Sequence, residues 1–380
     1  MRIAYLHACE IPSVFANGVH VMRMCDAFAD AGHDITLYAA TGSTPAEDIH
    51  AYYGTRNRFP VHTFAAPRIP VLGLWTRAWR VRLAVRRSGA VDLLYGRDLY
   101  ALLASAGLAP LVYETHLLRP GRDQRLMERL LFRMRGLRRV VTITQALAED
   151  YRRTVPRLRR PGGPEMVTAS DCADLPPTTG PTATLPGRPD ALKVGYVGHL
   201  YPGRGIDVIL ALAASVPDAD FHLVGGTDED LAHWRSRSRP PNVHFHGHRP
   251  PAQLHPYYRA FDLVLAPYQR RVACAGGVGD IGRWVSPMKL FEYMSHGKAI
   301  IASDLPVLRE VLTDGVNCVL CPPDDVAAWT AAVKRLADDP GERASLGQVA
   351  ERQLRRDYTW RARVDRVLPH LDSAPMRGNS

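Results

Sequence analysis

No apolar run in this chain of 380 residues approaches the ~20 residues that a membrane-spanning helix needs. The first ten residues, MRIAYLHACE, are too few and too weakly charged for a secretory signal peptide, and they fit a first buried strand better. These absences argue against an integral membrane protein and predict a cytoplasmic one. With 46% hydrophobic and 23% charged residues, the chain has the composition of a globular protein and the length of two ordinary domains.

Paired cysteine motifs are also scarce. The six cysteines are scattered along the chain as Cys9, Cys25, Cys172, Cys274, Cys318 and Cys321. The last two form a CxxC pattern in an apolar strand, where residues three apart face opposite sides. Without a second pair or a neighbouring histidine, this pattern favours core packing over a zinc or redox site.

Negative charge is sparse in the first 165 residues, which hold 24 arginines against 14 aspartates and glutamates. The net charge of +10 therefore lies in this half, in basic stretches such as 77–87 and 119–139, the second of which we expect to form a helix. These arginines lack interleaved aromatic residues and a nucleic-acid-reading motif, so nucleic acid is not the expected partner. Anionic lipid head groups or acidic glycans suit such a surface better, and we expect a peripheral contact at the inner membrane face.

Strand and helix patterns alternate along the chain in two series. The first series begins with the buried strand 2–9, and the second begins with the strand 193–198. Between them, residues 155–192 are rich in proline, glycine and threonine, as an interdomain connection is. The alternation predicts an α/β protein with two domains, residues 1–165 and 166–358.

The stretch from Gly276 to Glu310 organises the second half and reads GGVGDIGRWVSPMKLFEYMSHGKAIIASDLPVLRE. A glycine-rich loop leads through Ser286 and Pro287 into a helix predicted over 290–296. Proline suits the first turn of a helix because its missing N–H is not needed there. The free N–H groups at this helix start, together with the positive end of the helix dipole, predict an anion site.

Side chains at this helix start add to the predicted anion site. Lys289 supplies a mobile positive charge, and Glu292 lies one turn from Met288 on the same side of the helix. A phosphate cradle with a carboxylate nearby indicates a nucleotide. We expect its diphosphate on the N–H groups and its ribose hydroxyls on Glu292.

This segment resembles the C-terminal signature of retaining glycosyltransferase family 4, in the branch that reads S-P-x-K-x-F-E-Y-M-x-x-G-K-x-I-x-x-S-D-x-P. The resemblance implies the GT-B fold: two Rossmann-like domains facing across a cleft, with the donor mainly on the second and a final helix, about 359–380, packing back on the first. The family carries two glutamates eight positions apart; Glu292 is the second, but Trp284 stands at the first. Asp280 is then our candidate for contact with the donor sugar.

The resemblance also implies roles for residues elsewhere. Gly18 and His20 remain from the family's N-terminal loop G-G-x-x-x-H, and His116, in the ETH sequence at a strand end, matches a histidine near the sugar's anomeric carbon. His199 and Arg204 stand where the family has an arginine and a lysine that bracket the diphosphate. The expected catalytic residues are His116, Arg204 and Lys289. The expected donor-binding residues are Gly18, His199, Gly225, Asp280, Ser286, Pro287, Met288, Leu290 and Glu292.

Three further patterns have plainer interpretations. Residues 277–282 spell GxGxxG, but no strand leads directly into them, which disfavours a dinucleotide site. Asp218 and Asp220 form a DxD motif that we expect in a solvated turn at the amino edge of a sheet. The three histidines of VHFHGH (243–248) share a strand face, yet no fourth ligand is near in sequence, which disfavours zinc.

Together these features predict a retaining glycosyltransferase that moves a hexose or N-acetylhexosamine from a UDP- or GDP-sugar to a glycan, lipid-linked or natural-product acceptor. Cationic side chains would offset the charge on the leaving diphosphate, so we expect neither a metal nor another cofactor. Two alternatives stay open. One is a nucleotide-sugar 2-epimerase of the same fold; the other is a catalytically silent donor-binding partner in glycan assembly, because Trp284 replaces the first glutamate.

Overall fold

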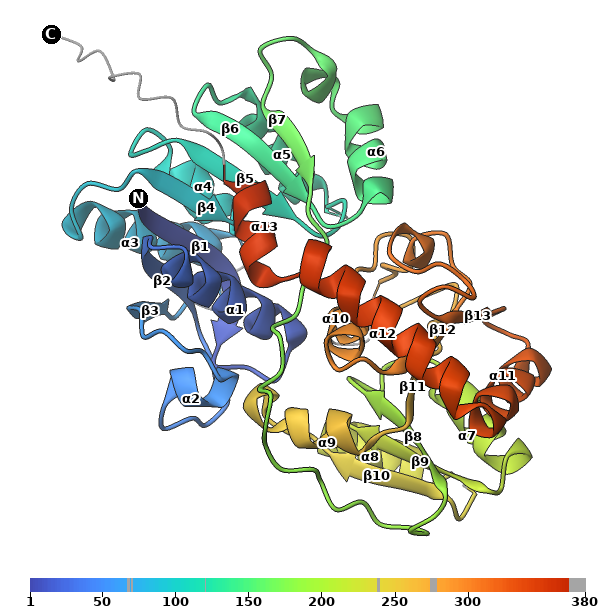
Figure 1. The fold of residues 1–380 in the computed structure, drawn as a ribbon. Coiled ribbons are helices and arrows are strands. Elements are labelled where there is room, and N and C mark those ends of the chain that lie inside the picture. Colours follow the sequence, from blue (N-terminus) through green and yellow to red (C-terminus); the bar gives the residue numbers. More distant parts are fainter. Residues whose placement is uncertain (67–68, 70, 120, 238–239, 274–278, 369–380) are drawn as a thin grey trace, which may run out of the picture.

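Within the residues that the structure describes, this computed structural model forms two parallel β-sheets with helices on both faces (Figure 1). The described residues are 1–66, 69, 71–119, 121–237, 240–273 and 279–368. All strand pairings given for the two sheets are parallel, which confirms the predicted α/β class and its two Rossmann-like units.

The first sheet reverses its strand order between its two central strands. Across the sheet, the described strands are β3 (Val61–Phe64), β2 (Asp34–Thr41), β1 (Arg2–Ile11), β4 (Leu93–Gly96), β5 (Leu111–Thr115), β6 (Leu137–Thr142) and β7 (Glu165–Thr168). β4 and β5 are buried along their whole length, so both faces must be covered and their sequences are apolar throughout. In open α/β sheets, ligands bind outside the carboxyl ends of the strands near such a reversal, here between β1 and β4.

Helices cover both faces of this sheet. Ile3 and Tyr5 of β1 point into the layer formed by α1 (Ala16–Asp30) and α13 (Trp360–Val367), whereas Ala4 and Leu6 point into the opposite layer. That opposite layer contains α3 (Leu72–Arg87), α4 (Leu99–Ser105), α5 (Arg122–Arg133) and α6 (Gln145–Thr154). The short helix α2 (Ile49–Tyr53) and the 3-10 helix η1 (Pro156–Arg159) complete the described helices of this half.

The second sheet repeats the same strand order. Its described strands are β10 (Val243–Gly247), β9 (Ala219–Val224), β8 (Leu192–Val197), β11 (Leu263–Ala266), β12 (Ala299–Ser303) and β13 (Val319–Cys321). Its described helices are α7 (Ile206–Ser215), α8 (Asp228–Arg235), η2 (Pro251–Gln253), α9 (His255–Ala260), α10 (Met288–Ser295), η3 (Leu308–Glu310), α11 (Val326–Asp338) and α12 (Pro340–Asp357). The reversal lies between β8 and β11, and α10 follows β11 at the carboxyl edge of the sheet.

The chain passes between the two halves after β7 and again after α12. β7 pairs with β6, so the first sheet runs to Thr168 and the boundary expected after residue 165 falls inside a strand. After α12, the chain turns at Thr359, whose side chain accepts a hydrogen bond from the N–H of Ala362 and so caps α13 (red in Figure 1). α13 then packs beside α1; residues 369–380 lie outside the described part.

The basic helix predicted over 119–139 was wrong at its C-terminal end. α5 ends at Arg133, and residues 137–142 form β6. Arginine has a good helix propensity, which made the whole stretch look helical. Tertiary pairing overrides that preference at Arg139, which is buried in β6 and donates from Nε to Glu165 of β7 at 3.0 Å.

The DxD prediction was also wrong for its second residue. Asp220 belongs to β9 and is 2% exposed, not solvated. Its carboxylate accepts hydrogen bonds from the backbone N–H of Arg188 at 2.7 Å and from the guanidinium of the same residue at 2.9 Å. These contacts fix the connection that leads into β8.

The CxxC cysteines pack in the core, as predicted. Cys318 and Cys321 belong to two different apolar clusters, on opposite faces of the second sheet. Burial raises the pKa of both thiols to about 12, so they stay protonated at neutral pH. Cys274 lies outside the described residues.

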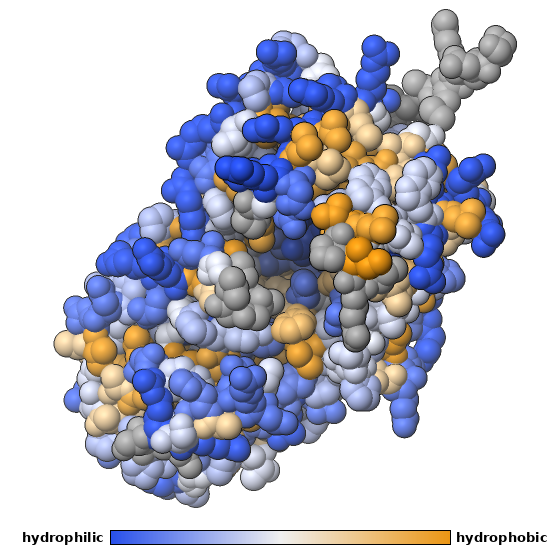
Figure 2. Space-filling view, turned by 180° about the vertical axis from the view of Figure 1, so that it is seen from behind, coloured by the Kyte–Doolittle hydropathy of each residue, from blue (hydrophilic) through white to orange (hydrophobic). Residues whose placement is uncertain are grey.

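Hydrophilic side chains cover much of the surface in Figure 2, with smaller apolar areas between them. No described helix is long and apolar enough to cross a bilayer.

Trp360 anchors α13 to the first domain, and we expect its loss to destabilise the protein. Its side chain is 3% exposed and packs in the same cluster as Val21 and Met24 of α1. The substitution Trp360→Ala should lower the free energy of unfolding by about 3–5 kcal/mol, because removal of a buried indole leaves a cavity. Urea unfolding followed by circular dichroism measures the change.

Trp79→Ala is the matched control, since Trp79 lies in the same domain but is 57% exposed. It should change the free energy of unfolding by less than about 0.5 kcal/mol. Equal effects of the two substitutions would contradict the packing of α13 in the core of the first domain.

Candidate functional site

The predicted anion site lies where β11 leads through a loop into α10. α10 begins at Met288, two residues earlier than predicted, and Pro287 is its N-cap with an extended backbone (φ −81°, ψ 115°). The first N–H groups of a helix have no acceptor within the helix and carry the positive end of its dipole. Residues 274–278 of the preceding loop, which include the start of the GxGxxG pattern, lie outside the described part.

Three side-chain nitrogens near this helix start are buried without a hydrogen-bond partner. They are Nζ of Lys289, Nε of Arg204 and Nδ1 of His199, and none has a partner in the part of the chain that the structure describes. The Nζ atom of Lys289 lies 3.6 Å from the ring centre of Tyr196 and 5.3 Å from that of Tyr268. The Arg204 guanidinium also lies 5.3 Å from the Tyr268 ring, so both cations share one aromatic wall.

The electrostatics of this group favour an incoming anion. Burial, followed by the nearby Arg204 charge, holds the pKa of Lys289 well below its usual range. Burial likewise lowers the pKa of His199 to about 4, and the charges of Arg204 and Lys289 add to the effect. A buried donor without an acceptor costs about 1–3 kcal/mol, and more when it is charged. Phosphate oxygens in this space would accept from these donors and remove that cost.

Two glycines shape the space around Lys289. Gly198 follows β8 with φ +141°, and a Cβ added there would lie 2.6 Å from Nζ of Lys289. Gly225 follows β9 with φ +125°, and a Cβ there would lie 2.2 Å from the carbonyl oxygen of Gly198. The loops at the carboxyl ends of β8 and β9 therefore touch, and only glycine fits at the contact.

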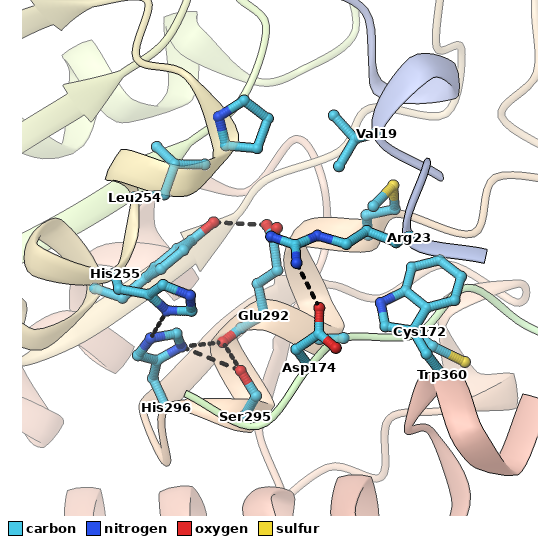
Figure 3. A pocket seen from close by; sticks show the side chains of 14 residues that line it. Val19, Arg23, Cys172, Asp174, Leu254, His255, Glu292, Ser295, His296 and Trp360 are labelled. Carbon is cyan, nitrogen blue, oxygen red and sulfur yellow. Dashed lines mark hydrogen bonds and ion pairs between the residues drawn. The ribbon is translucent and has the colours of Figure 1, made fainter. Parts of the chain in front are cut away.

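Glu292 faces a pocket between α1, α9, α10 and α13 (Figure 3). Its Oε2 accepts a hydrogen bond from the Tyr258 hydroxyl at 2.6 Å. Burial raises the pKa of this carboxyl group and outweighs the opposing effects of Tyr258 and Arg23. Met288 lines the same pocket one turn earlier, so the two residues share a helix face as predicted. In Figure 3 the guanidinium of Arg23 lies beside Glu292, and it pairs with Asp174 at 3.1 Å.

Two expected donor-binding residues bond the protein's own loops. Oδ1 of Asp280 accepts hydrogen bonds from the N–H groups of Val272 at 3.0 Å and Gly282 at 2.8 Å. Oγ of Ser286 accepts the N–H of Asp171, on the connection between the domains, at 2.9 Å. Both side chains therefore position the segment before α10.

Two other expected donor-binding residues are packed inside the protein. Leu290 is 1% exposed in the core of the second domain. Gly18 lies in the first turn of α1, where an added Cβ would be 2.7 Å from the hydroxyl of Tyr53 and 2.8 Å from Oγ of Ser13. The glycine is needed there for close packing.

Trp284, at the position of the family's first glutamate, contacts the first domain. Its Nε1 donates to Asp150 of α6 at 2.7 Å, and Nε of Arg283 donates to the same carboxylate at 2.7 Å. The bond from Arg283, helped by that from Trp284, outweighs burial and holds the pKa of Asp150 at about 2. Glu310 of the second domain also accepts the first two N–H groups of α6, at 2.7 and 3.0 Å. The second domain thus holds α6 at two points.

A buried cluster surrounds Glu114 at the carboxyl edge of the first sheet. This carboxylate is 0% exposed and lies 2.6 Å from Nε2 of His116, 2.9 Å from Nε2 of His20 and 3.1 Å from Nη2 of Arg363. The Tyr95 hydroxyl also donates to it. Burial opposes the negative charge, but Arg363 and the two imidazoles outweigh burial and hold the pKa of Glu114 well below its usual range. The group is therefore a carboxylate at neutral pH.

The two histidines of this cluster differ in charge. Burial, with the nearby Arg97 charge, lowers the pKa of His116 to about 3, so its neutral ring donates from Nε2 to Glu114. Nδ1 of His116 is then free of a proton and can accept from a hydroxyl. Burial also disfavours charge on His20, but Glu114 and Asp171 outweigh it and raise the pKa of His20. Nδ1 of His20 lies 2.7 Å from Asp171.

Sequence reasoning assigned no role to three members of this cluster. Glu114 lies in β5, two positions before His116, which follows the strand end, and that spacing, typical of residues on one face, could have pointed to it. Asp171 lies in the irregular connection after β7, and Arg363 comes from the last described helix. Neither residue carries a local pattern that indicates its partners.

His20, Glu114 and His116 are the one set of potential metal ligands found in the described part of the chain, with ligand atoms within 4.8 Å of one another. Because Glu114 already bonds Arg363 and Tyr95, a cation there would compete with a guanidinium. The histidines of 243–248 do not converge on one point. His246 bonds His222 at 3.2 Å, whereas His248 bonds the Tyr52 hydroxyl at 3.3 Å.

Two family models match the chain in succession. Residues 18–160 match Glycosyltransferase Family 4, and residues 191–339 match Glycosyl transferases group 1. The phosphatidyl-myo-inositol mannosyltransferase of Mycolicibacterium smegmatis is 28% identical over 226 residues, which cover 56% of this chain and 53% of that protein. This match spans only about half the length of the relative. A glycogen synthase of Mycobacterium tuberculosis is 24% identical over 95% of this chain and 92% of its own.

Solved structures share the fold over nearly the whole chain. The Anabaena protein HepE in complex with UDP-glucose superposes with a TM-score of 0.69 at 18% identity, over 97% of this chain and 98% of that chain. Sucrose-phosphate synthase from Thermosynechococcus elongatus superposes with a TM-score of 0.67 at 18% identity, over 95% and 96%. The two facing sheets, the family models and these neighbours agree, and the chain belongs to the family 4 type of glycosyltransferases with the GT-B fold.

Proposed function

We propose that this glycosyltransferase moves a hexose or N-acetylhexosamine from a UDP- or GDP-sugar to a glycan, lipid-linked or natural-product acceptor, with retention at the anomeric carbon. The observation that carries the proposal is the set of buried, unpartnered nitrogens of Lys289, Arg204 and His199. A diphosphate supplies the acceptor oxygens that these donors lack, and charge-assisted bonds to it are strong. The complex of HepE with UDP-glucose supports a nucleotide sugar as the donor.

Each part of the donor has a matching group in this proposal. The diphosphate lies at the start of α10 against Lys289 and Arg204, the two cations of the unpartnered set. The ribose hydroxyls bond the carboxylate of Glu292 in its pocket. The sugar lies toward the first domain, where the unprotonated Nδ1 of His116 accepts from one of its hydroxyls.

The proposed reaction needs charge stabilisation more than a general base. The bond from the anomeric carbon to the leaving phosphate oxygen breaks, and a bond to the acceptor oxygen forms on the same face of the sugar. Negative charge grows on the diphosphate, where Lys289 and Arg204 stabilise it. The leaving phosphate oxygen takes the acceptor's proton, and no divalent metal is required.

Two other functions use the same donor site. A nucleotide-sugar 2-epimerase of this fold would need no acceptor, and a silent partner would bind the donor without turnover. Product analysis after incubation with the matching nucleotide sugar separates the three, because only a transferase links the sugar to an added acceptor.

Binding of a nucleoside diphosphate should stabilise the protein without a metal. We expect one of UDP, GDP, ADP and dTDP to raise the melting temperature, because a ligand at about 100 times its Kd adds about 2.7 kcal/mol of stability. EDTA should leave this shift unchanged. No shift with any of the four nucleotides would contradict the anion site, and a shift lost in EDTA would contradict metal independence.

Lys289→Met should lower kcat by about 10²–10³-fold and change the KM for the donor far less. Methionine keeps the unbranched shape but removes a charge that acts mainly on the leaving diphosphate in the transition state. Lys298→Met is the matched control, since Lys298 is half-buried in the same domain but donates to the carbonyl oxygens of Arg259 at 3.1 Å and Phe261 at 2.6 Å. Steady-state kinetics that show equal kcat values in Lys289→Met and wild type would remove Lys289 from this role.

Donor binding should also transfer a proton from the buffer to Lys289. The pKa of Lys289 is low in the free protein, chiefly through burial, and a bound diphosphate would raise it. Between the two pKa values only the complex holds the proton, so the affinity for the diphosphate falls as the pH rises through this window. Calorimetry above the nucleotide's own phosphate pKa of about 6 should give binding enthalpies that depend on the buffer. Lys289→Met should lose this dependence; buffer-independent enthalpies in the wild type would contradict the mechanism.

A further inference from the structure

Exposed apolar side chains gather on the first domain. Seven of the ten large apolar residues that are exposed in the described part of the chain lie in two segments of this domain. They are Ile69, Val71, Leu72, Trp79 and Leu83 in or just before α3, and Leu126 and Leu130 on α5. Such gathering differs from the single apolar residues scattered over most protein surfaces and marks an interaction site.

The spacing of these residues aligns them along each helix. Leu72, Trp79 and Leu83 are seven and four positions apart on α3, so they form one stripe on its outer side. Leu126 and Leu130 are four apart on the outer side of α5. Both stripes therefore lie opposite the buried faces of their helices.

α3 and α5 belong to one layer of the first domain. Both pack against α4, and their inner residues share one apolar cluster on the same face of the sheet. The ring of Trp75 on α3 meets Tyr100 of α4 edge-on at 5.4 Å, and the Tyr100 hydroxyl lies 3.4 Å from Asp123 at the start of α5. The two stripes consequently lie on one side of the molecule, and Figure 2 shows apolar and strongly hydrophilic side chains interspersed on the first-domain half.

Arginines without acidic partners surround these stripes. The exposed arginines of the two helices without an ion pair among the described residues include Arg86, Arg87, Arg122, Arg125, Arg129 and Arg133. Several exposed arginines of the second domain pair with carboxylates, as Arg309 does with Asp304 and Arg355 does with Glu351. The surface thus combines apolar groups with positive charge that the chain itself leaves uncompensated.

Both helices begin at the sheet edge that carries the first-domain residues of the site. α3 and α5 follow β3 and β5, so their N-terminal ends lie at the carboxyl edge of the sheet, where Glu114 and His116 lie. Leu72, at the start of α3, therefore lies on the same edge as the cluster around Glu114. Docking through these helices therefore engages the domain that carries the Glu114 cluster.

We propose that the outer face of α3 and α5 docks on an anionic lipid bilayer. Tryptophan and leucine suit the boundary between head groups and acyl chains, and the arginines suit anionic head groups. A second copy of the chain is disfavoured as the occupant, because its equivalent face would bring the same uncompensated positive charge. Docking holds the site next to a lipid-embedded acceptor. The inference does not depend on the identity of the sugar donor.

Vesicle sedimentation tests the apolar stripe. The full chain should bind phosphatidylglycerol vesicles at about 0.05 M salt, bind phosphatidylcholine vesicles far less, and lose binding as salt rises to about 0.5 M. Trp79→Ser/Leu83→Ser should lower the partition coefficient by about tenfold or more. The matched control, Leu175→Ser/Val316→Ser, removes two exposed apolar residues elsewhere, which are 43% and 51% exposed, and should leave binding unchanged.

A second pair of variants tests the charges. Arg125→Gln/Arg129→Gln should weaken binding to phosphatidylglycerol vesicles by about 30-fold, given the contribution of each arginine near an anionic surface. Arg235→Gln/Arg352→Gln removes the same charge from exposed positions of the second domain and should have little effect. Equal losses in the two pairs, no binding by the wild type, or equal binding to neutral vesicles would each overturn the proposal.

The same variants separate this inference from the donor proposal. All four should keep the wild-type melting-temperature shift with the stabilising nucleoside diphosphate, because none replaces a residue that we propose to bind the donor. Loss of vesicle binding with an intact nucleotide shift supports the docking face. If vesicle binding follows the expected pattern while no nucleotide stabilises any variant, the docking face stands and the donor proposal falls.

Discussion

The buried carboxylate of Glu114 is the constraint on which the first domain and its part of the site depend. A carboxylate without water costs several kcal/mol unless opposite charge and hydrogen-bond donors surround it. Here those donors come from three separate segments: His20 from α1, His116 from the end of β5 and Arg363 from α13. The return of the chain to the first sheet through α13 therefore supplies the charge that lets Glu114 stay ionised, and Glu114 in turn fixes the neutral ring of His116.

Buried charges have different surroundings in the two halves of the site. In the first domain, the buried charges lie against opposite charges: Glu114 lies 2.9 Å from His20 and 3.1 Å from Arg363, and His20 lies 2.7 Å from Asp171. In the second domain, Lys289 and Arg204 lie against tyrosine rings, with nitrogens that lack an acceptor in the described residues. Charges that already have a counter-charge keep their side chains in place. Charges without one are stabilised by a bound ligand of opposite charge. The proposed division of labour follows, with a fixed histidine on the sugar side and responsive cations on the diphosphate side.

Local patterns in the sequence predicted the α/β fold and, to within two residues, the start of α10. They did not predict the long-range contacts. The βα alternation and the S-P-M-K segment are short-range signals, because strand burial, helix starts and helix faces depend on neighbouring residues. Lys289 and Glu292 belong to one helix, yet Lys289 points to the loop at Gly198 and Glu292 to the pocket beside Arg23. Which residue meets Asp171 or Arg363 depends on how segments far apart in the sequence pack on the first sheet, and no local spacing encodes that.

Trp284 shows how a departure from the family pattern can be compensated within the fold. A glutamate at this position would place a second carboxylate beside Asp150, which now accepts from Trp284 and Arg283 at 2.7 Å each. Two such carboxylates repel, and one would have to take up a proton. Trp284 and Asp150 are therefore compatible as a pair, and their bond ties the segment before α10 to α6 of the other domain. The tryptophan therefore has a structural role of its own.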